Sequence, residues 1–190
     1  MEIYVLDIRK IRRKDEKKVE EVMPRRFAYC KNFMNHDDYL RSLGASILML
    51  KHLPFKNEDS FGKTEKGKPY IINGPEFNYS HSGNKVILAV SANEKIGVDV
   101  EAIDEENLSF KEQIFPKELE YINKDPLNNF HLLWTKKEAM GKLLGYGLSF
   151  KNKDVVINEK DEIVFNGKTV KFISYIKKGY AYSVAFLSNK

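Results

Sequence analysis

Apolar and acidic side chains alternate in residues 96–101. They read Ile96-Gly97-Val98-Asp99-Val100-Glu101. The alternation predicts a β-strand with Asp99 and Glu101 on one face and Val98 and Val100 on the other, toward a core. Carboxylates about 7 Å apart along a strand repel each other unless a cation or a base lies between them. The spacing therefore indicates a hard-cation site suited to magnesium rather than zinc, with a solvated strand edge as the alternative.

A second motif lies on a helix that we predict at about residues 127–144. It reads Trp134-Thr135-Lys136-Lys137-Glu138-Ala139-Met140-Gly141-Lys142. Glu138 and Lys142 are four residues apart, so they share one face of this helix. The simplest alternative is a surface ion pair worth only about a few tenths of a kcal/mol, and such pairs are common. Trp134 is expected to pack in the core, as large aromatic side chains on helices usually do.

A third stretch ends a predicted strand with hydroxyl and imidazole groups. It reads Phe77-Asn78-Tyr79-Ser80-His81-Ser82-Gly83. Ser80 and His81 would stand where the chain turns, and the alternative is simply a polar turn. A serine hydrolase is not supported, because no Gly-x-Ser-x-Gly sequence occurs in the chain.

The remaining pattern predicts an α+β chain of two pseudo-symmetric lobes, each a helix packed on a small, mostly antiparallel sheet. Expected strands cover residues 3–8, 77–80, 86–91, 96–103, 155–158, 163–165, 169–176 and 180–187. Expected helices cover a short segment before Pro24, residues 36–52, short pieces within 110–123, and residues 127–144. A polar loop is expected around Gly62, Gly67 and Pro69. We place the N-terminal lobe at residues 1–95 and the C-terminal lobe at residues 96–190.

Composition limits the class of protein and the kind of site. The chain has 190 residues, 42% of them hydrophobic, a net charge of +5 and a single cysteine, Cys30. One cysteine excludes an intrachain disulfide and a cysteine-based zinc cluster within one chain. No run approaches the roughly 18 apolar residues of a membrane span, and no secretory leader is visible, so we expect a cytoplasmic protein. The basic charge is compatible with nucleic acid, membranes, phosphorylated small molecules or an acidic protein as partner.

Together these stretches resemble the 4′-phosphopantetheinyl transferase superfamily, whose signature joins a Gly-x-Asp-x-Glu strand to a Trp-x-x-Lys-Glu-Ala-x-x-Lys helix. The two parts stand here at residues 97–101 and 134–142. Further matches lie upstream at Gly67-Lys68-Pro69, Asn78-Tyr79-Ser80-His81-Ser82, Arg25, Arg26 and Arg41, so that the resemblance covers roughly residues 20–150. The chain is similar to the surfactin-synthetase-activating type, which has two pseudo-symmetric lobes in one polypeptide. It is longer than the holo-acyl-carrier-protein synthase type, which has one lobe per chain and forms trimers.

The resemblance implies a magnesium-dependent site with coenzyme A between the two lobes. Asp99, Glu101 and Glu138 would hold the metal ion. Lys142 would neutralise the diphosphate and the departing 3′,5′-ADP. The nucleotide end of coenzyme A would contact a set of polar and cationic residues: Arg26, Arg41, Lys68, Ser80 and His81. The family often has a lysine where this chain has Tyr29, and Arg25 could compensate for it at the 3′-phosphate.

The implied reaction moves the phosphopantetheine arm of coenzyme A to a serine of an acyl carrier protein or a peptidyl carrier domain. The serine hydroxyl would attack the β-phosphorus in line, while magnesium and Lys142 stabilise the charge that spreads over the phosphoryl group. Glu138 would take the serine proton, either directly or through a metal-bound water. Because one chain holds both lobes, we expect a monomer. A basic enzyme surface would attract the acidic carrier.

Three alternative functions stay open. A basic nucleic-acid-binding module would explain the mixture of cationic and aromatic residues, but it leaves the three carboxylates unexplained. A family member that binds coenzyme A without transferring the arm would keep the same residues. A different magnesium-dependent phosphotransferase is disfavoured, since the sequence has no Walker-type glycine-rich loop. We therefore predict neither a nucleic acid nor a membrane as partner.

Overall fold

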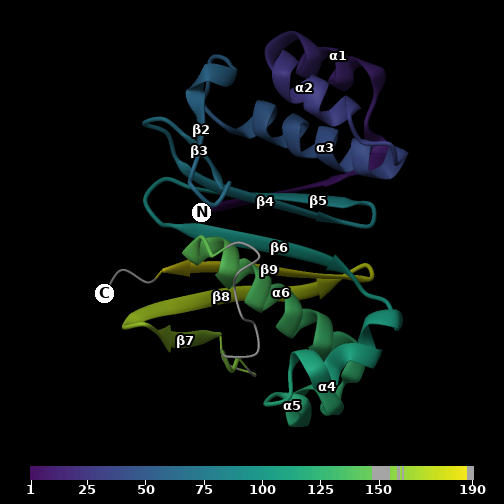
Figure 1. Cartoon of the computed structure of the whole chain (residues 1–190), viewed down its shortest axis with the longest axis vertical. Helices are drawn as coiled ribbons and strands as arrows, with labels where there is room; N and C mark the ends of the chain where they lie inside the picture. The colour runs from purple at the N-terminus through teal and green to yellow at the C-terminus, as the bar shows by residue number, and fades with distance from the viewer. Residues whose placement is uncertain (147–154, 158, 160, 188–190) are drawn as a thin grey trace. The chain divides into compact units, whose positions relative to one another are not determined.

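The computed structural model describes residues 1–146, 155–157, 159 and 161–187, and Figure 1 shows the course of the chain. The structure is α+β, with three antiparallel sheets and with helices packed on them, which confirms the predicted class. Contacts between residues divide the chain into two compact units, Met1–Asn93 and Glu94–Lys190. In the part of the chain that is described, no helix is both long and apolar enough to cross a bilayer.

A three-stranded antiparallel sheet organises the first unit. Its order is β1 (Glu2–Asp7), β5 (Lys85–Ser91) and β4 (Glu76–Ser82), so that β5 is the central strand. Tyr79 on β4 and Tyr4 on β1 both stand opposite Leu88 of β5. All three strands were predicted from the alternation of their side chains, and the structure confirms them.

Helix α3 (His36–His52) packs on this sheet and has the bounds that the sequence predicted. The Asn35 side chain begins the helix, because its Oδ1 accepts the backbone N–H groups of Asp37 at 2.8 Å and Asp38 at 3.2 Å. The core between helix and sheet is apolar and includes Leu48, Met49, Phe77, Val86 and Leu88.

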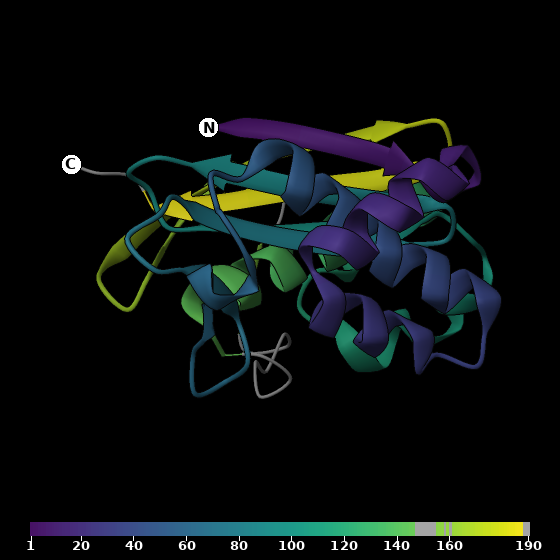
Figure 2. The same ribbon diagram turned by 90° about the horizontal axis from the view of Figure 1, so that it is seen from above.

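Two shorter helices pack against α3 and follow the short turn η1 (Ile8–Lys10). Helix α1 (Arg13–Val22) was predicted, whereas α2 (Pro24–Lys31) was not. Pro24 is the first residue of α2, a position where its missing N–H costs nothing, so reading it only as a helix end hid the second helix. The three helices share a second core made of Val19, Met23, Phe27, Leu43 and Ile47. Figures 1 and 2 show them on one face of the sheet of this unit.

A small hairpin stands where the sequence predicted a loop, and that prediction was wrong. It consists of η2 (Glu58–Ser60), β2 (Phe61–Lys63) and β3 (Pro69–Ile71). The strands pair antiparallel, with Gly62 opposite Tyr70. Strands of three residues are too short to show the period-2 alternation on which the prediction depends.

The second unit contains a four-stranded antiparallel sheet in the order β6-β9-β8-β7. Its strands are β6 (Ile96–Ala102), β7 (Glu162–Phe165), β8 (Lys168–Lys177) and β9 (Tyr180–Leu187). A further strand was predicted at residues 155–158, but residues 155–157 form none, and Asn158 lies outside the described residues. Val155 and Ile157 are buried in the core instead, so their apolar character reflected packing and not strand pairing.

Helix α6 (Pro126–Leu144) packs on one face of this sheet and confirms the long helix predicted there. Gly145 ends it in the left-handed conformation, with φ of 71°. The short pieces before it are η3 (Glu106–Phe110), α4 (Lys111–Ile114) and α5 (Leu119–Lys124). The core under α6 includes Phe115, Ile122, Phe130, Leu133, Met140, Leu143, Val170 and Phe172.

Candidate active site

A glycine brings β6 into direct contact with α6. A Cβ atom at Gly97 would overlap the carbonyl oxygen of Ala139 and the amide nitrogen of Leu143, both of which belong to the helix backbone. The face of β6 that carries Gly97 also carries Asp99 and Glu101, so both carboxylates are on the side of the strand that faces α6.

The alternation predicted for β6 is confirmed by burial. Val98 and Val100 are fully buried on the face away from α6. Asp99 keeps 2% of its surface exposed, and Glu101 is half-buried. This strand is therefore not a solvated edge, and that alternative is excluded.

Lys142 forms an ion pair with Asp99, its Nζ lying 2.5 Å from Asp99 Oδ1. The side chain of Lys142 is 28% exposed and that of Asp99 only 3%. A buried carboxylate is costly without a cation nearby, so Lys142 stabilises Asp99 in this position. The pair joins the strand motif to the helix motif. The sequence placed Lys142 on one helix face with Glu138 but did not predict its contact with Asp99, because spacing along a helix shows nothing of its contacts with a strand.

A chain of hydroxyl groups lies next to this ion pair. Ser183 on β9 stands opposite Asp99, and its Oγ lies 2.7 Å from Thr135 Oγ1 on α6 and 2.8 Å from Ser174 Oγ on β8. Ser183 and Thr135 are fully buried. These hydrogen bonds fix α6 on the sheet beside Asp99. These contacts could not be predicted, since a single serine or threonine in a periodic pattern carries no distinctive signal.

Glu101 lines a small cavity of about 240 Å³ in the second unit. The other lining residues are Asn107, Phe130, His131 and Trp134. Both nitrogens of His131 are engaged, Nδ1 lying 2.8 Å from the Leu127 carbonyl oxygen and Nε2 accepting the Asp104 backbone N–H at 3.4 Å. Trp134 packs against the core, as predicted. Among the described lining residues, Glu101 supplies the carboxylate.

The three carboxylates predicted to bind magnesium are not preassembled as a metal cluster. Within the described ranges, no group of three or more His, Cys, Asp or Glu side chains is arranged to hold a metal ion. Asp99 has the ammonium group of Lys142 beside it, and Glu138 is partly exposed on α6. The donor types nevertheless fit magnesium, because carboxylate oxygens are the hard ligands that it prefers. The position taken by Lys142 shows that positive charge is stable against Asp99 Oδ1.

Lys137, the residue before Glu138, forms a second ion pair that is wholly buried. Its Nζ lies 2.5 Å from Glu118 Oε1, and neither side chain has exposed surface. Ile157 donates its backbone N–H to the same oxygen at 3.2 Å, and the Phe115 ring centre lies 4.6 Å from Nζ. Burial lowers the pKa of Lys137 from its ordinary value, although the Glu118 carboxylate opposes this shift. Lys137 is thus structural, a role that sequence reasoning missed.

Arg26 is held between two aromatic rings in the first unit. Its Nε donates to Ser46 Oγ at 3.1 Å and its Nη2 to the Tyr79 hydroxyl at 3.4 Å. The guanidinium carbon lies 5.1 Å from the ring centre of Tyr29 and 5.8 Å from that of Tyr79. Such cation–π contacts fix the orientation of the guanidinium group. Tyr29 therefore packs against a cation.

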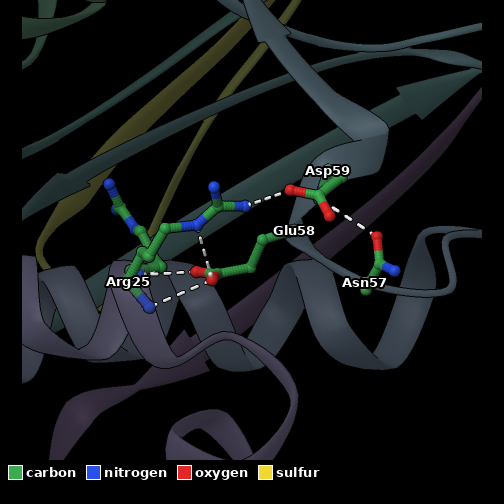
Figure 3. Close-up of polar contacts among 5 residues, drawn as sticks. Arg25, Asn57, Glu58 and Asp59 are labelled. Atoms are coloured by element: carbon green, nitrogen blue, oxygen red, sulfur yellow. Dashed lines mark hydrogen bonds and ion pairs between the residues drawn. The ribbon is translucent and has the colours of Figure 1, made fainter.

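A cavity of about 690 Å³ lies beside Arg26 in the first unit. Helix α2 contributes Arg25, Arg26 and Tyr29 to its lining, and the hairpin contributes Phe61, Lys63 and Gly67. Glu58 and Asp59 belong to the same lining, and Figure 3 shows them beside Arg25. A lining that mixes cationic and aromatic side chains suits a ligand with an anionic group and a flat ring.

The other four residues predicted to bind the nucleotide are not among the described lining residues of this cavity. Arg41 donates a hydrogen bond to the carbonyl oxygen of Gly83 at 3.0 Å, which holds it at the turn between β4 and β5. The side chain of Lys68 is 16% exposed. Ser80 is buried on β4, and the adjacent His81 is exposed. Of the predicted set, the structure thus brings Arg26 to the cavity.

Comparisons with known proteins agree with the two motifs at the junction of β6 and α6. The 4′-phosphopantetheinyl transferase superfamily matches residues 95–185. The 4′-phosphopantetheinyl transferase gsp of Aneurinibacillus migulanus is 36% identical over 127 residues, which cover 61% of this chain and 53% of that protein. The 4′-phosphopantetheinyl transferase of Bacillus subtilis is 32% identical over 145 residues, which cover 70% of this chain and 64% of that protein.

A third relative, the 4′-phosphopantetheinyl transferase psf-1 of Bacillus pumilus, is 29% identical over 168 residues, which cover 79% of this chain and 71% of that protein. The matched part of the chain spans 53% and 64% of the lengths of the Aneurinibacillus and Bacillus subtilis relatives. The resemblance inferred from the motifs is confirmed, and over residues 95–185 the chain is similar to the 4′-phosphopantetheinyl transferase superfamily.

Proposed function

We propose that this protein transfers the 4′-phosphopantetheine arm of coenzyme A to a serine of an acyl carrier protein or a peptidyl carrier domain, with release of 3′,5′-ADP. The observation that carries the proposal is the ion pair between Asp99 and Lys142, within the region that matches the superfamily. A buried carboxylate beside a partly exposed ammonium group is suited to hold a cation and an anionic diphosphate next to each other.

Asp99, Glu101 and Glu138 are the residues that would hold magnesium. When bound, the ion would polarise the phosphoryl oxygens and offset the charge of the diphosphate. Asp99 and Glu101 support this assignment because both lie on the face of β6 that backs against α6, and Glu138 lies on that helix.

Lys142 would stabilise the diphosphate and the leaving 3′,5′-ADP. Its ammonium group is close to Asp99, and 28% of the Lys142 side chain is exposed. An incoming phosphate can therefore reach this lysine without opening the core. Charge that develops on the phosphoryl oxygens in the transition state would strengthen this contact, which is how a fixed cation accelerates the transfer.

Glu138 is the carboxylate that would take the proton from the carrier serine. Its side chain is partly exposed on α6, as access to a hydroxyl of another protein requires. Because the nucleophile belongs to the carrier, the enzyme needs a base and an anion site but no nucleophile of its own.

The nucleotide end of coenzyme A would bind in the first unit. Arg26 would contact its phosphates from the wall of the 690 Å³ cavity, where Tyr29 offers a ring face to the adenine. The same proposal includes Arg41, Lys68, Ser80 and His81 as further contacts. A relation of the two units as pseudo-symmetric lobes is supported by their parts, since each has an antiparallel sheet packed against one long helix, α3 or α6.

Intact-protein mass spectrometry tests the transfer. An apo acyl carrier protein and an apo peptidyl carrier domain are each incubated with the enzyme, coenzyme A and magnesium, with EDTA as control. We expect a gain of about 340 Da, the mass of the arm, which EDTA abolishes because the reaction needs a bound metal. Binding of coenzyme A with no gain on either carrier would favour the family member that binds without transferring, and no binding at all would contradict the proposal.

A further inference from the structure

The N-terminus of helix α2 is capped by a carboxylate that comes from outside the helix. Pro24 has no N–H, and Met23 before it has no side-chain acceptor for the next two. The backbone N–H groups of Arg25 and Arg26 donate to the two oxygens of Glu58, at 3.0 Å to Oε2 and 2.6 Å to Oε1 (Figure 3). A single carboxylate, 32 residues along the chain from Arg26, therefore satisfies both donors.

Further polar contacts surround this cap. Arg25 Nε donates to Glu58 Oε2 at 3.2 Å, and Arg25 Nη2 donates to Asp59 Oδ1 at 2.5 Å. Asn57 Oδ1 accepts the Asp59 backbone N–H at 3.0 Å, which shapes the turn that presents Glu58 to the helix. Burial separates the two acids, since the Glu58 side chain is 11% exposed and that of Asp59 76%.

This cap joins the two walls of the 690 Å³ cavity. Helix α2 carries Arg26 in one wall. The turn that carries Glu58 leads directly into β2, which carries Lys63, and Lys63 stands opposite Pro69 of β3. The Ile72 backbone N–H, directly after β3, donates to the Ser60 carbonyl oxygen at 2.9 Å. The end of β3 is therefore also bonded to the turn that carries Glu58. The position of Arg26 relative to Lys63 therefore depends on Glu58.

We propose that Glu58 is a positioning residue for the nucleoside phosphate part of coenzyme A, because its carboxylate fastens α2 to the hairpin and sets the separation of the cavity walls. This inference rests on the proposed function. By charge alone, an acid in this lining repels a phosphate and weakens binding. If Glu58 positions the cavity walls, its removal should weaken binding of the phosphate. If it acts by charge alone, its removal should strengthen binding, so an affinity measurement distinguishes the two roles.

The test compares Glu58→Ala and Glu58→Gln with Asp59→Asn, an exposed acid of the same turn. Calorimetry measures the Kd of 3′,5′-ADP, and transfer assays give KM for coenzyme A and kcat. We expect Glu58→Ala to weaken binding about five- to twentyfold, with kcat within about twofold, since two helix donors lose their acceptor. Glu58→Gln, which keeps one acceptor oxygen, should recover part of the loss, and Asp59→Asn should bind equally well or more tightly.

A second measurement tests the fastening without any ligand. Hydrogen exchange of residues 24–31 and 61–71 should be faster in Glu58→Ala than in the wild type and unchanged in Asp59→Asn, because the cap protects both segments. Unchanged exchange in Glu58→Ala, an unchanged Kd, or tighter binding in Glu58→Gln would each overturn the inference. A wild type that neither binds 3′,5′-ADP nor modifies a carrier would overturn the proposed function and leave Glu58 nothing to position. If Glu58→Ala fails to fold, Glu58→Gln carries both measurements.

Discussion

Two ion pairs of helix α6 have the same length and opposite surroundings. The Nζ–O distance is 2.5 Å both between Lys142 and Asp99 and between Lys137 and Glu118. The side chain of Lys142 is 28% exposed, whereas that of Lys137 is not exposed at all. A lysine whose side chain is partly exposed can exchange its carboxylate for a phosphate that arrives from solvent, but a sealed one cannot do so while the core stays closed. Access to solvent, and not contact geometry, therefore distinguishes a candidate site from a structural support.

The sealed pair also links parts of the chain that are distant in sequence. Glu118 precedes α5, Lys137 lies on α6, and Ile157 donates its backbone N–H to Glu118. The second oxygen of Glu118 has no hydrogen-bond partner within the described residues. The carboxylate therefore depends on Lys137 for its compensating charge.

Breaking the sealed pair should have the largest effect on stability. Glu118→Ala leaves Lys137 charged in the core without a counterion, so we expect the free energy of unfolding to fall by about 3–5 kcal/mol. Urea unfolding followed by circular dichroism measures this. Glu159→Ala is the matched control, since it removes an exposed pair with Lys124 of the same 2.5 Å length, and it should change nothing measurable. A comparable loss in both variants would contradict the role of burial.

Breaking the partly exposed pair of Lys142 and Asp99 should instead abolish activity and spare the fold. Asp99→Ala removes a carboxylate from the proposed metal site, and we expect the transfer rate to fall by about 10²–10³-fold. The free energy of unfolding should change little, because Lys142 can turn to solvent. Glu162→Ala, which removes an exposed carboxylate of the same sheet, serves as control. A near-normal rate for Asp99→Ala at saturating magnesium would rule out the assignment of Asp99 as a metal ligand.

Removing Lys142 from the same pair should have a smaller effect than removing Asp99. Lys142→Ala keeps the carboxylate but removes the cation proposed to stabilise the leaving group, so kcat should fall about tenfold and KM for coenzyme A should change less. Lys142→Arg should restore part of kcat. Steady-state kinetics on an apo carrier protein measure both constants. If kcat were unchanged in Lys142→Ala, the lysine would have no part in the chemical step.

Elements with a strong period could be predicted from the sequence, whereas the three-residue strands β2 and β3 could not. The apolar spacing of α3 and the alternation in β6 indicated both elements, because burial on one face leaves a regular pattern. Strands of three residues, such as β2 and β3, leave no such pattern. Helix α2 begins with Pro24, and a proline signals a helix start as readily as a helix end.

The candidate site could be predicted as a set of residues but not as a set of contacts. The spacing put Asp99 and Glu101 on one face, yet the partner of Asp99 is Lys142, 43 residues away, and only tertiary packing brings them together. Gly97 was a signal that could have been used, since a glycine inside a buried strand often marks a close approach of two backbones. Lys137 could not be assigned, because neighbouring lysines on a helix look alike until one of them is buried.

The smallest expected effect is a pH dependence of stability that belongs to Lys137 alone. Burial lowers the pKa of Lys137 below its ordinary value of 10.5, so between the lowered pKa and 10.5 the unfolded chain binds more protons than the folded chain. The contribution of Lys137 to the free energy of unfolding should therefore rise with pH in this window. Below the window both states are protonated, and the cost of burying the charge is fully present.

The double variant Lys137→Met/Glu118→Leu lacks this titration and fills the same space with apolar side chains. Its advantage in unfolding free energy over the wild type should therefore shrink as the pH rises toward 10.5, which urea unfolding at steps from neutral pH upward measures. An advantage that stays constant would mean that Lys137 keeps its proton over the whole pH range. The Glu118 carboxylate would then offset the effect of burial on the pKa of Lys137 completely. The two lysines would then not differ in the free-energy cost of carrying a charge. Only the partial exposure of the Lys142 side chain would distinguish its pair from that of Lys137.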